Sequence, residues 1–253
     1  MSNKIIKSTR TKVNFAKFAA VIAFSTSGYA IASDLDYLLA TGNCFNCVIR
    51  NVDLSGKVLA WDTIENTTFQ NVTIKNAKIS IKSITNVTWE RTDFTNSNVR
   101  IDQITRATFQ DDTFKSATFQ TNSISNSHIR RVDFSFGRFS AGTMNKTLIE
   151  DFSSPSSTWD IGYYFDSEVR RGDMRQANVN IRAIRLRFAN LNMTQATLNV
   201  LDTNRFTQDL TVHDSDLSYA NVNFYRSGTL INFTGATNLN NTHINGRPAN
   251  VIE

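Results

Sequence analysis

Apolar residues recur at every fifth position through the first half of the chain. Counting from Cys44 to Ile149 in steps of five gives 22 consecutive apolar residues without a slip. The positions before these centres are mostly polar, with threonine and aspartate frequent among them, and the positions after them are also mostly polar. A period of five fits neither an α-helix, with about 3.6 residues per turn, nor an extended strand, with two. Each five-residue unit must therefore contain a turn, and stacked units would bury their centres together.

These units resemble the pentapeptide-repeat family, whose unit reads roughly Ala-(Asp/Asn)-(Leu/Phe)-(Ser/Thr)-Gly. Close matches are Val52-Asp53-Leu54-Ser55-Gly56, Thr92-Asp93-Phe94-Thr95-Asn96, Val132-Asp133-Phe134-Ser135-Phe136 and Ala220-Asn221-Val222-Asn223-Phe224. The resemblance is continuous over 42–151 and continues with slips over 167–246, although glycine and alanine are scarcer than in the family's unit. It implies an all-β fold, a right-handed quadrilateral parallel β-helix (a pentapeptide-repeat solenoid) with four units per coil.

Four units per coil place residues 20 positions apart on the same face, one coil above the other. A column of alternating charge then follows, formed by Asn71, Arg91, Asp111, Arg131 and Asp151. Opposite charges one coil apart favour the correct register. A second column departs from the unit, because its mostly apolar members Trp61, Ile81, Ile101, Thr121 and Ala141 precede Asp62, Lys82, Asp102, Asn122 and Gly142. We expect the apolar members to point inward and the charged ones to lie at a corner.

The first 32 residues have the pattern of a secretory signal peptide. Five basic residues precede the apolar stretch 18–24, and the small residues that follow end in Ala30-Ile31-Ala32. We expect cleavage between Ala32 and Ser33 and export to the periplasm or the outside of a bacterial cell. About seven strongly apolar residues are too few for a membrane anchor, and no later segment reaches the roughly 20 needed.

The same residues account for the net charge of +5, because they hold five of the 27 basic residues and no acid. The remainder has 27 − 5 = 22 basic and 22 acidic residues, a net charge of zero. A nucleic-acid partner is therefore not expected. The DNA mimicry known in the family does not carry over either, since it requires an acidic rod in the cytoplasm.

The pattern divides the exported chain into five segments. Residues 33–41 are predicted to form a short N-terminal capping helix, 42–151 the regular β-helix, and 167–246 its irregular continuation. Between these, 152–166 contains Pro155, several serines and several aromatic residues, and is predicted to be a loop thrown out from the coil. The tail 247–253 is too short to cap the last coil, so an end-to-end homodimer through that coil is considered.

Two features are candidate binding surfaces. The predicted loop carries Trp159, Tyr163 and Tyr164, and binding residues often lie on such excursions from a rigid scaffold. The alternative is that these aromatic side chains fold back and cover the coil edge. A basic band formed by Arg170, Arg171, Arg175, Arg182, Arg185 and Arg187 follows the loop. It would suit an anionic polysaccharide, lipid headgroups or an acidic protein, the alternative being an ordinary solvated face.

Cys44 and Cys47 are the only cysteines, and three histidines are scattered along the chain. This set is too small and too dispersed for a zinc site. Both cysteines occupy inward positions of the first coil, and we keep two readings open, buried thiols or a local disulfide in an oxidising compartment. The sequence contains no metal-binding loop, no phosphate-binding glycine loop and no nucleophile motif, so no cofactor, metal or catalytic residue is expected.

The leading hypothesis is an exported, non-enzymatic β-helical scaffold that binds a protein or an anionic envelope glycan. One alternative is a β-helical carbohydrate-active enzyme, a lyase or hydrolase, that uses outward aspartate and arginine residues such as those of the 91–151 column. A second alternative is a purely structural envelope component without a specific ligand.

Overall fold

The computed structural model describes residues 33–182, 185–201, 208–225, 229–245 and 250–252. These residues belong to one compact unit, Ala32–Glu253. The predicted signal peptide, residues 1–32, lies outside the described residues, so its cleavage after Ala32 stays a prediction. Within the described ranges, no helix combines the length and the apolar character needed to cross a membrane.

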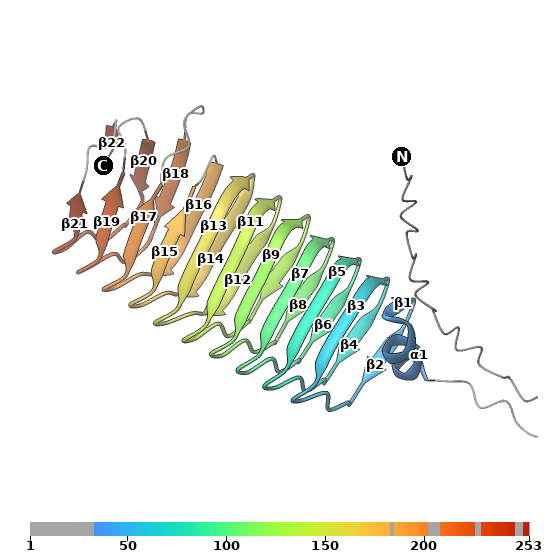
Figure 1. Ribbon diagram of the computed structural model, residues 1–253. Coiled ribbons are helices and arrows are strands. Elements are labelled where there is room, and N and C mark those ends of the chain that lie inside the picture. The colour runs from blue at the N-terminus through green and yellow to red at the C-terminus, as the bar shows by residue number, and fades with distance from the viewer. Residues whose placement is uncertain (1–32, 183–184, 202–207, 226–228, 246–249, 253) are drawn as a thin grey trace, which may run out of the picture. The chain divides into compact units, whose positions relative to one another are not determined.

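The described chain winds through two parallel sheets of 11 strands each, and successive coils add a strand to each sheet (Figure 1). Sheet A contains β1 (Asn43–Phe45), β3 (Val58–Glu65), β5 (Lys78–Thr85), β7 (Asn98–Thr105), β9 (Thr118–Ser125), β11 (Arg138–Asn145), β13 (Thr158–Phe165), β15 (Asn178–Ile181), β17 (Thr197–Val200), β19 (Asn221–Phe224) and β21 (His243–Asn245). Sheet B contains β2 (Val48–Arg50), β4 (Thr68–Gln70), β6 (Thr88–Glu90), β8 (Thr108–Gln110), β10 (His128–Arg130), β12 (Leu148–Ser153), β14 (Ser167–Asp173), β16 (Arg185–Asn192), β18 (Gln208–His213), β20 (Thr229–Thr234) and β22 (Asn250–Ile252). The fold is an all-β parallel β-helix, as the five-residue period predicts.

The corners of each coil explain how a five-residue unit can turn. In one coil, Asn66, Asn71 and Asn76 have φ angles of 49°, 54° and 51°, in the left-handed region. Asparagine tolerates this region better than most residues, which accounts for its frequency here. The fourth corner lies inside the longer strands of sheet A, where Trp61 points inward and the side chain of Asp62 is exposed. The expectation for this second column is therefore confirmed.

Aromatic unit centres stack from coil to coil inside the helix. Phe69 and Trp89 are stacked with ring centroids 3.8 Å apart, and Phe94 and Phe114 with centroids 4.5 Å apart. Such contacts add to the free energy of burying the rings. No single coil could bury these side chains alone, so the core is shared between neighbouring coils.

The prediction of a loop over 152–166 is wrong. Strand β12 continues to Ser153, a tight turn follows, and β13 begins at Thr158 in register with β11. The apolar pattern failed because Ser154 occupies a centre position. Ser154 is nevertheless fully buried, since its Oγ lies 2.7 Å from Ser157 Oγ and accepts a hydrogen bond of 2.7 Å from Trp159 Nε1. The five-residue register therefore continues through this segment.

The second half continues the solenoid with altered register. Strands β13 and β15 pair residues 20 apart, β15 and β17 pair residues 19 apart, and β17 and β19 pair residues 24 apart, as with Asn178↔Thr197 and Thr197↔Asn221. The predicted tail 247–253 includes β22, which pairs with β20 at the end of sheet B. This corrects the view of that segment as a simple tail.

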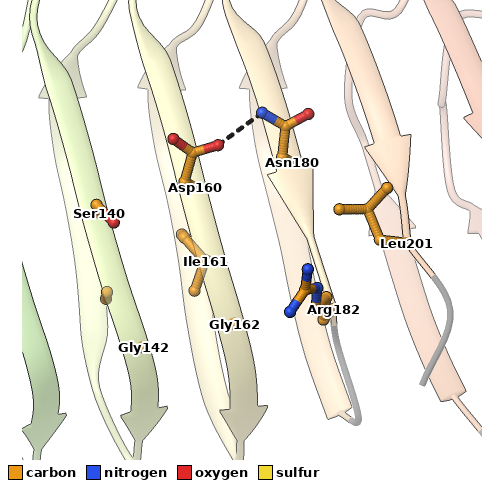
Figure 2. Close-up of a pocket in the computed structure, with 9 residues that line it drawn as sticks. Ser140, Gly142, Asp160, Ile161, Gly162, Asn180, Arg182 and Leu201 are labelled. Carbon is orange, nitrogen blue, oxygen red and sulfur yellow. Dashed lines mark hydrogen bonds between the residues drawn. The ribbon is translucent and has the colours of Figure 1, made fainter. Parts of the chain in front are cut away.

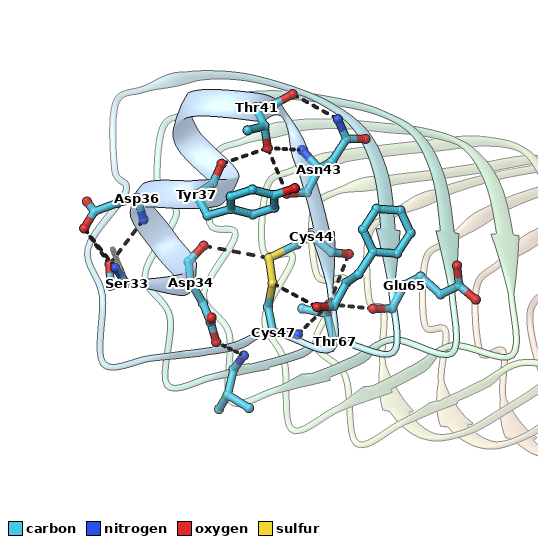
Figure 3. The surroundings of a disulfide bond; sticks show 12 residues. Ser33, Asp34, Asp36, Tyr37, Thr41, Asn43, Cys44, Cys47, Glu65 and Thr67 are labelled. Carbon is cyan, nitrogen blue, oxygen red and sulfur yellow. Dashed lines mark hydrogen bonds between the residues drawn. A yellow bond between two sulfur atoms is a disulfide. The ribbon is translucent and has the colours of Figure 1, made fainter. Parts of the chain in front are cut away.

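The N-terminal end carries the predicted capping helix, α1 (Asp34–Thr41). Ser33 and Asp36 form a capping box, and Leu38 is fully buried. Below the helix, Cys44 and Cys47 form a disulfide bond (Figure 3). The Asp34 side chain joins helix and coil, because its Oδ2 accepts a hydrogen bond of 2.7 Å from the Val48 N–H. Two interpretations were left open for the cysteines, buried thiols or a local disulfide, and the structure contains the disulfide.

Removing this disulfide by a Cys44→Ser, Cys47→Ser double substitution is expected to destabilise the first coil. A closed loop of four residues contributes about 2 kcal/mol by the chain-entropy relation. Because the bond lies below α1, amide hydrogen exchange should accelerate in α1 and β1 while β9 and β11 stay protected. Unchanged exchange in α1 and an unchanged unfolding midpoint would contradict this prediction.

Candidate functional site

The aromatic residues proposed for binding occupy ordinary positions of β13. Trp159 and Tyr164 are unit centres, with only 1% and 0% of their surface exposed. Burial raises the pKa of the Tyr164 hydroxyl well above its usual value. Neither residue can contact a ligand without unfolding, so their proposed role is wrong. Tyr163, between the two centres, remains on the surface with 39% exposure.

The predicted arginine band is distributed over several surfaces. Arg170 and Arg171 lie on β14, Arg175 on the following turn, Arg182 just after β15, and Arg185 on β16. Five of the six side chains of the band are ion-paired, as shown by Arg170–Glu150 at 2.7 Å, Arg171–Asp151 at 2.6 Å, Arg175–Asp173 at 2.7 Å, Arg185–Asp166 at 3.4 Å and, also on β16, Arg187–Glu168 at 3.8 Å. They therefore do not make one continuous basic surface.

The alternating charge column forms as the 20-residue spacing predicts. Arg91 Nε donates to Asn71 Oδ1 at 2.7 Å, and Arg131 donates to both carboxylate oxygens of Asp111 at 2.5 and 3.0 Å. The hydrogen bond from Arg131 is the main reason that the pKa of Asp111 falls to about 2. A carboxylate held in this way is a weak base, and it is ionised at neutral pH and so cannot act as an acid. The column is better suited to holding coils in register than to catalysis.

A surface that we did not predict follows the second half of sheet A. Asn180, Asn199, Asn223 and Asn245 lie one above the other on successive strands. Each Nδ2 donates to the preceding side chain's Oδ1, with distances of 2.7 Å from Asn199 to Asn180, 2.8 Å from Asn223 to Asn199 and 2.9 Å from Asn245 to Asn223. Asn180 donates in turn to Asp160 Oδ1 at 2.7 Å. We call these four residues the asparagine ladder.

The ladder leaves hydrogen-bonding capacity facing outward. An asparagine amide has two N–H donors and two acceptor lone pairs. Each interior Oδ1 of the ladder accepts one hydrogen bond from the next side chain, and Asn223 Nδ2 donates one, whereas Asn199 Nδ2 also donates to Asn178 Oδ1 at 3.2 Å. Asn178 and Asn221 are exposed on the same strands and add further amide groups. Neighbouring parallel strands are about 4.8 Å apart. The result is a regular, neutral array of paired donors and acceptors on a strand surface.

A second polar column lies at the corner that leads into these strands. Ser156 Oγ donates to Gln176 Oε1 at 3.2 Å, and Gln176 Nε2 donates to Gln195 Oε1 at 3.0 Å. In the same column Phe136 and Tyr219 are each 60% exposed, at φ angles of 58° and 59°. Bulky side chains are rare in this backbone region, and such strain is often found at functional sites.

Between these features and the regular half of the rod lies a hollow of about 260 Å³ (Figure 2). Its lining includes Ser140, Gly142, Asp160, Gly162, Asn180 and Arg182. Asp160 and Asn180 point toward one another above it, and Arg182 stands at one side, as Figure 2 shows. Of the residues predicted for binding, Arg182 alone lines this hollow.

Comparisons with known proteins do not identify the chain. No known family profile matches it, and no curated protein is similar enough to be matched. Among solved structures, it is similar to the plasmid-mediated fluoroquinolone resistance protein QnrB1, with 13% identity over 78% of this chain and 91% of that one, at a TM-score of 0.26. The pentapeptide-repeat protein HetL of the cyanobacterium Nostoc has 10% identity over 79% of this chain and 86% of that one, at a TM-score of 0.23.

The surface adhesin PfbA of Streptococcus pneumoniae has 8% identity over 85% of this chain and 86% of that one, at a TM-score of 0.26. Similarities of this size carry no functional argument. The class of the protein, a parallel β-helical solenoid, follows from its own strand order and register. Its function has to be inferred from its own surface.

Proposed function

We propose that this protein is an exported, non-enzymatic pentapeptide-repeat solenoid that binds an extended envelope glycan along sheet A. The asparagine ladder is the observation that carries the proposal. Sugar hydroxyl groups donate and accept at once, so they match amides that keep an acceptor lone pair and, as at Asn223, a second N–H donor. Exposed Tyr219 lies at the corner that leads into β19 of the ladder, and exposed Phe136 lies in the same corner column two coils before Asn180. Both offer ring faces to the C–H surfaces of a sugar.

A polysaccharide fits this surface better than a folded protein partner. The centres of protein interfaces are fully desolvated and rich in aromatic residues and arginine, whereas lysine, glutamate and aspartate are depleted there. The ladder is instead a polar strip, and its exposed aromatic side chains lie at the flanking corner. A long chain could make the same contact at each successive coil, and many weak contacts of this kind add up through multivalency.

Two features support an extracytoplasmic location. The first 32 residues combine five basic residues, a short apolar stretch and a small-residue cleavage pattern. The Cys44–Cys47 disulfide also favours an oxidising compartment, because cytosolic thiols are kept reduced. We therefore propose that the mature chain begins at Ser33 and acts in the periplasm or on the cell surface.

Two alternatives remain distinguishable. A carbohydrate-active enzyme would need a carboxylate able to exchange protons, whereas Asp111 is held ionised by Arg131. A purely structural component would bind no glycan.

The end-to-end homodimer also stays a proposal, and light scattering after size-exclusion chromatography of the mature chain measures it directly.

The ladder can be tested by an Asn199→Ala, Asn223→Ala double substitution. We expect retention on a polysaccharide array to weaken at least tenfold, since each neutral hydrogen bond contributes about 1 kcal/mol. Asn122→Ala is the matched control, because Asn122 also donates to the preceding coil, at 3.3 Å to Asp102 Oδ1, but lies outside the ladder. No retention of any polysaccharide by the wild-type protein, or equal retention of the double variant, would overturn the proposed function. Release of new reducing ends would favour the enzyme.

A further inference from the structure

The hollow of Figure 2 arises from a change in the corner column of sheet A. In earlier coils this column carries the side chains of Asp62, Lys82, Asp102 and Asn122, whereas the next two coils have Gly142 and Gly162. The two glycines approach so closely that a Cβ on Gly162 would collide with the carbonyl oxygen of Gly142. The rod surface is therefore indented over two coils, beside the beginning of the asparagine ladder.

The charges around the hollow are unequally compensated. Asp160 Oδ1 accepts a hydrogen bond of 2.7 Å from Asn180, and Asp160 Oδ2 forms an ion pair with Arg138. The negative charge of Asp160 is thus matched by a cation on the neighbouring strand β11. Arg182, the other charged residue of the lining, is exposed at the rim. An anionic group entering the hollow would meet the Arg182 guanidinium without displacing an ion pair among the described residues.

We propose that the hollow is a subsite for one carboxylate-bearing sugar, a uronic acid residue of the bound glycan. This proposal rests on the proposed function. The planar guanidinium of Arg182 matches a carboxylate with two parallel hydrogen bonds. The Ser140 hydroxyl and the Asn180 amide border the same space and suit ring hydroxyl groups, while Leu201 supplies an apolar edge. A volume of about 260 Å³ is below that of sites for drug-sized ligands, which suits a single ring better than a folded ligand.

Continuity with the asparagine ladder determines where the rest of the bound glycan lies. Asn180 belongs both to the hollow and to the ladder, so a sugar seated against it is followed by neighbours over Asn199 and Asn223. The hollow then recognises the charge of one sugar, and the neutral ladder contacts the sugars that follow it. Acidic and neutral forms of the same polymer should consequently differ in affinity through Arg182 alone.

The test uses polygalacturonate and hyaluronate, each compared with its methyl ester, which keeps the chain but removes the carboxylate charge. We expect the wild-type mature protein to bind at least one acidic polymer about tenfold more tightly than its ester in isothermal titration calorimetry. Arg182→Gln should abolish this preference while retaining binding to the ester, and Arg182→Lys should restore part of it. Arg100→Gln is the matched control, because Arg100 is an exposed arginine of sheet A paired with Asp102 at 2.9 Å, outside the hollow.

The outcomes separate this inference from the proposed function. Equal binding of acid and ester by the wild-type protein, or a preference that survives Arg182→Gln, overturns the uronate subsite and leaves the glycan-binding ladder intact. Loss of the preference in Arg100→Gln as well overturns it too, since general charge attraction would then suffice. Absence of binding to every polymer overturns both proposals.

Discussion

Phe134→Ala is expected to lower the free energy of unfolding by about 3–5 kcal/mol, whereas Phe136→Asn, two residues further on, is expected to preserve or raise it. The two phenylalanines differ sharply in burial, with 3% and 60% of their surface exposed. Phe134 is a unit centre whose ring centroid lies 5.3 Å from Phe114 and 5.4 Å from Phe139. Its truncation leaves a cavity shared by neighbouring coils, which a rigid stack of strands cannot close.

Phe136 is the matched control because it has a φ angle of 58° at a corner. Asparagine occupies the same corner column at Asn76 and Asn96, and it adopts this backbone region at lower cost. Urea unfolding followed by circular dichroism measures both variants. Comparable destabilisation by the two substitutions would show that the stacked centres do not carry the stability of the rod.

The sequence pattern predicted the coil, its inward residues and its corner columns because each depends on local chemistry repeated at a fixed spacing. The segment 152–166 was misjudged for one physical reason. Ser154 is polar yet buried, and its hydrogen bonds with Ser157 and Trp159 compensate the cost of burying its hydroxyl. A hydrophobic pattern cannot distinguish such a satisfied hydroxyl from the beginning of a loop.

The candidate site could not be predicted because it depends on distances between coils in the irregular half. Asn180, Asn199 and Asn223 are aligned in space, but they are 19 and 24 residues apart, so a search at a spacing of 20 misses them. The prediction of a continuous arginine band failed for the converse reason. Its members are close in sequence, but the corners of the coil turn them onto different faces, and most meet an acidic residue one coil away or on the same turn.

A buried carboxyl group adds a pH dependence to the regular half of the rod. Asp112 is 3% exposed and occupies an inward position held by Val132 one coil later. Its Oδ1 accepts a hydrogen bond of 2.6 Å from the Thr92 N–H, and its Oδ2 one of 3.0 Å from the Gln110 N–H. Burial nevertheless raises its pKa well above the usual 3.8. Asp111, Asp133 and Asp151 line a second hollow together with Asp112, separate from that of Figure 2, and Arg131 there donates a hydrogen bond to Asp111.

Asp112→Ser is therefore expected to flatten the dependence of stability on pH above about pH 4. The raised pKa means that the folded protein binds more protons than the unfolded chain once the pH exceeds 3.8. Asp112 thus costs no stability below that pH, and the free energy of unfolding declines as the pH rises toward the folded pKa, by up to about 1.4 kcal/mol per pH unit. Serine is a fitting replacement, because Ser127 Oγ at a comparable corner accepts the Ala107 N–H at 3.1 Å and donates to the Ser125 carbonyl at 2.8 Å.

The measurement is urea unfolding of wild type and Asp112→Ser at intervals between pH 4 and neutrality, with the difference between them taken at each pH so that other titrating groups cancel. The free energy of unfolding of the variant, relative to that of the wild type, should increase as the pH rises toward the folded pKa of Asp112. The neighbouring Asp111→Ser is the control, and its difference from the wild type should stay constant over this range, since a folded pKa of about 2 confines the change to lower pH, where its stabilisation is lost as the pH falls from 3.8 toward 2. A difference between wild type and Asp112→Ser that does not change with pH would mean that the buried carboxyl stays ionised, held by the two backbone N–H groups despite its burial.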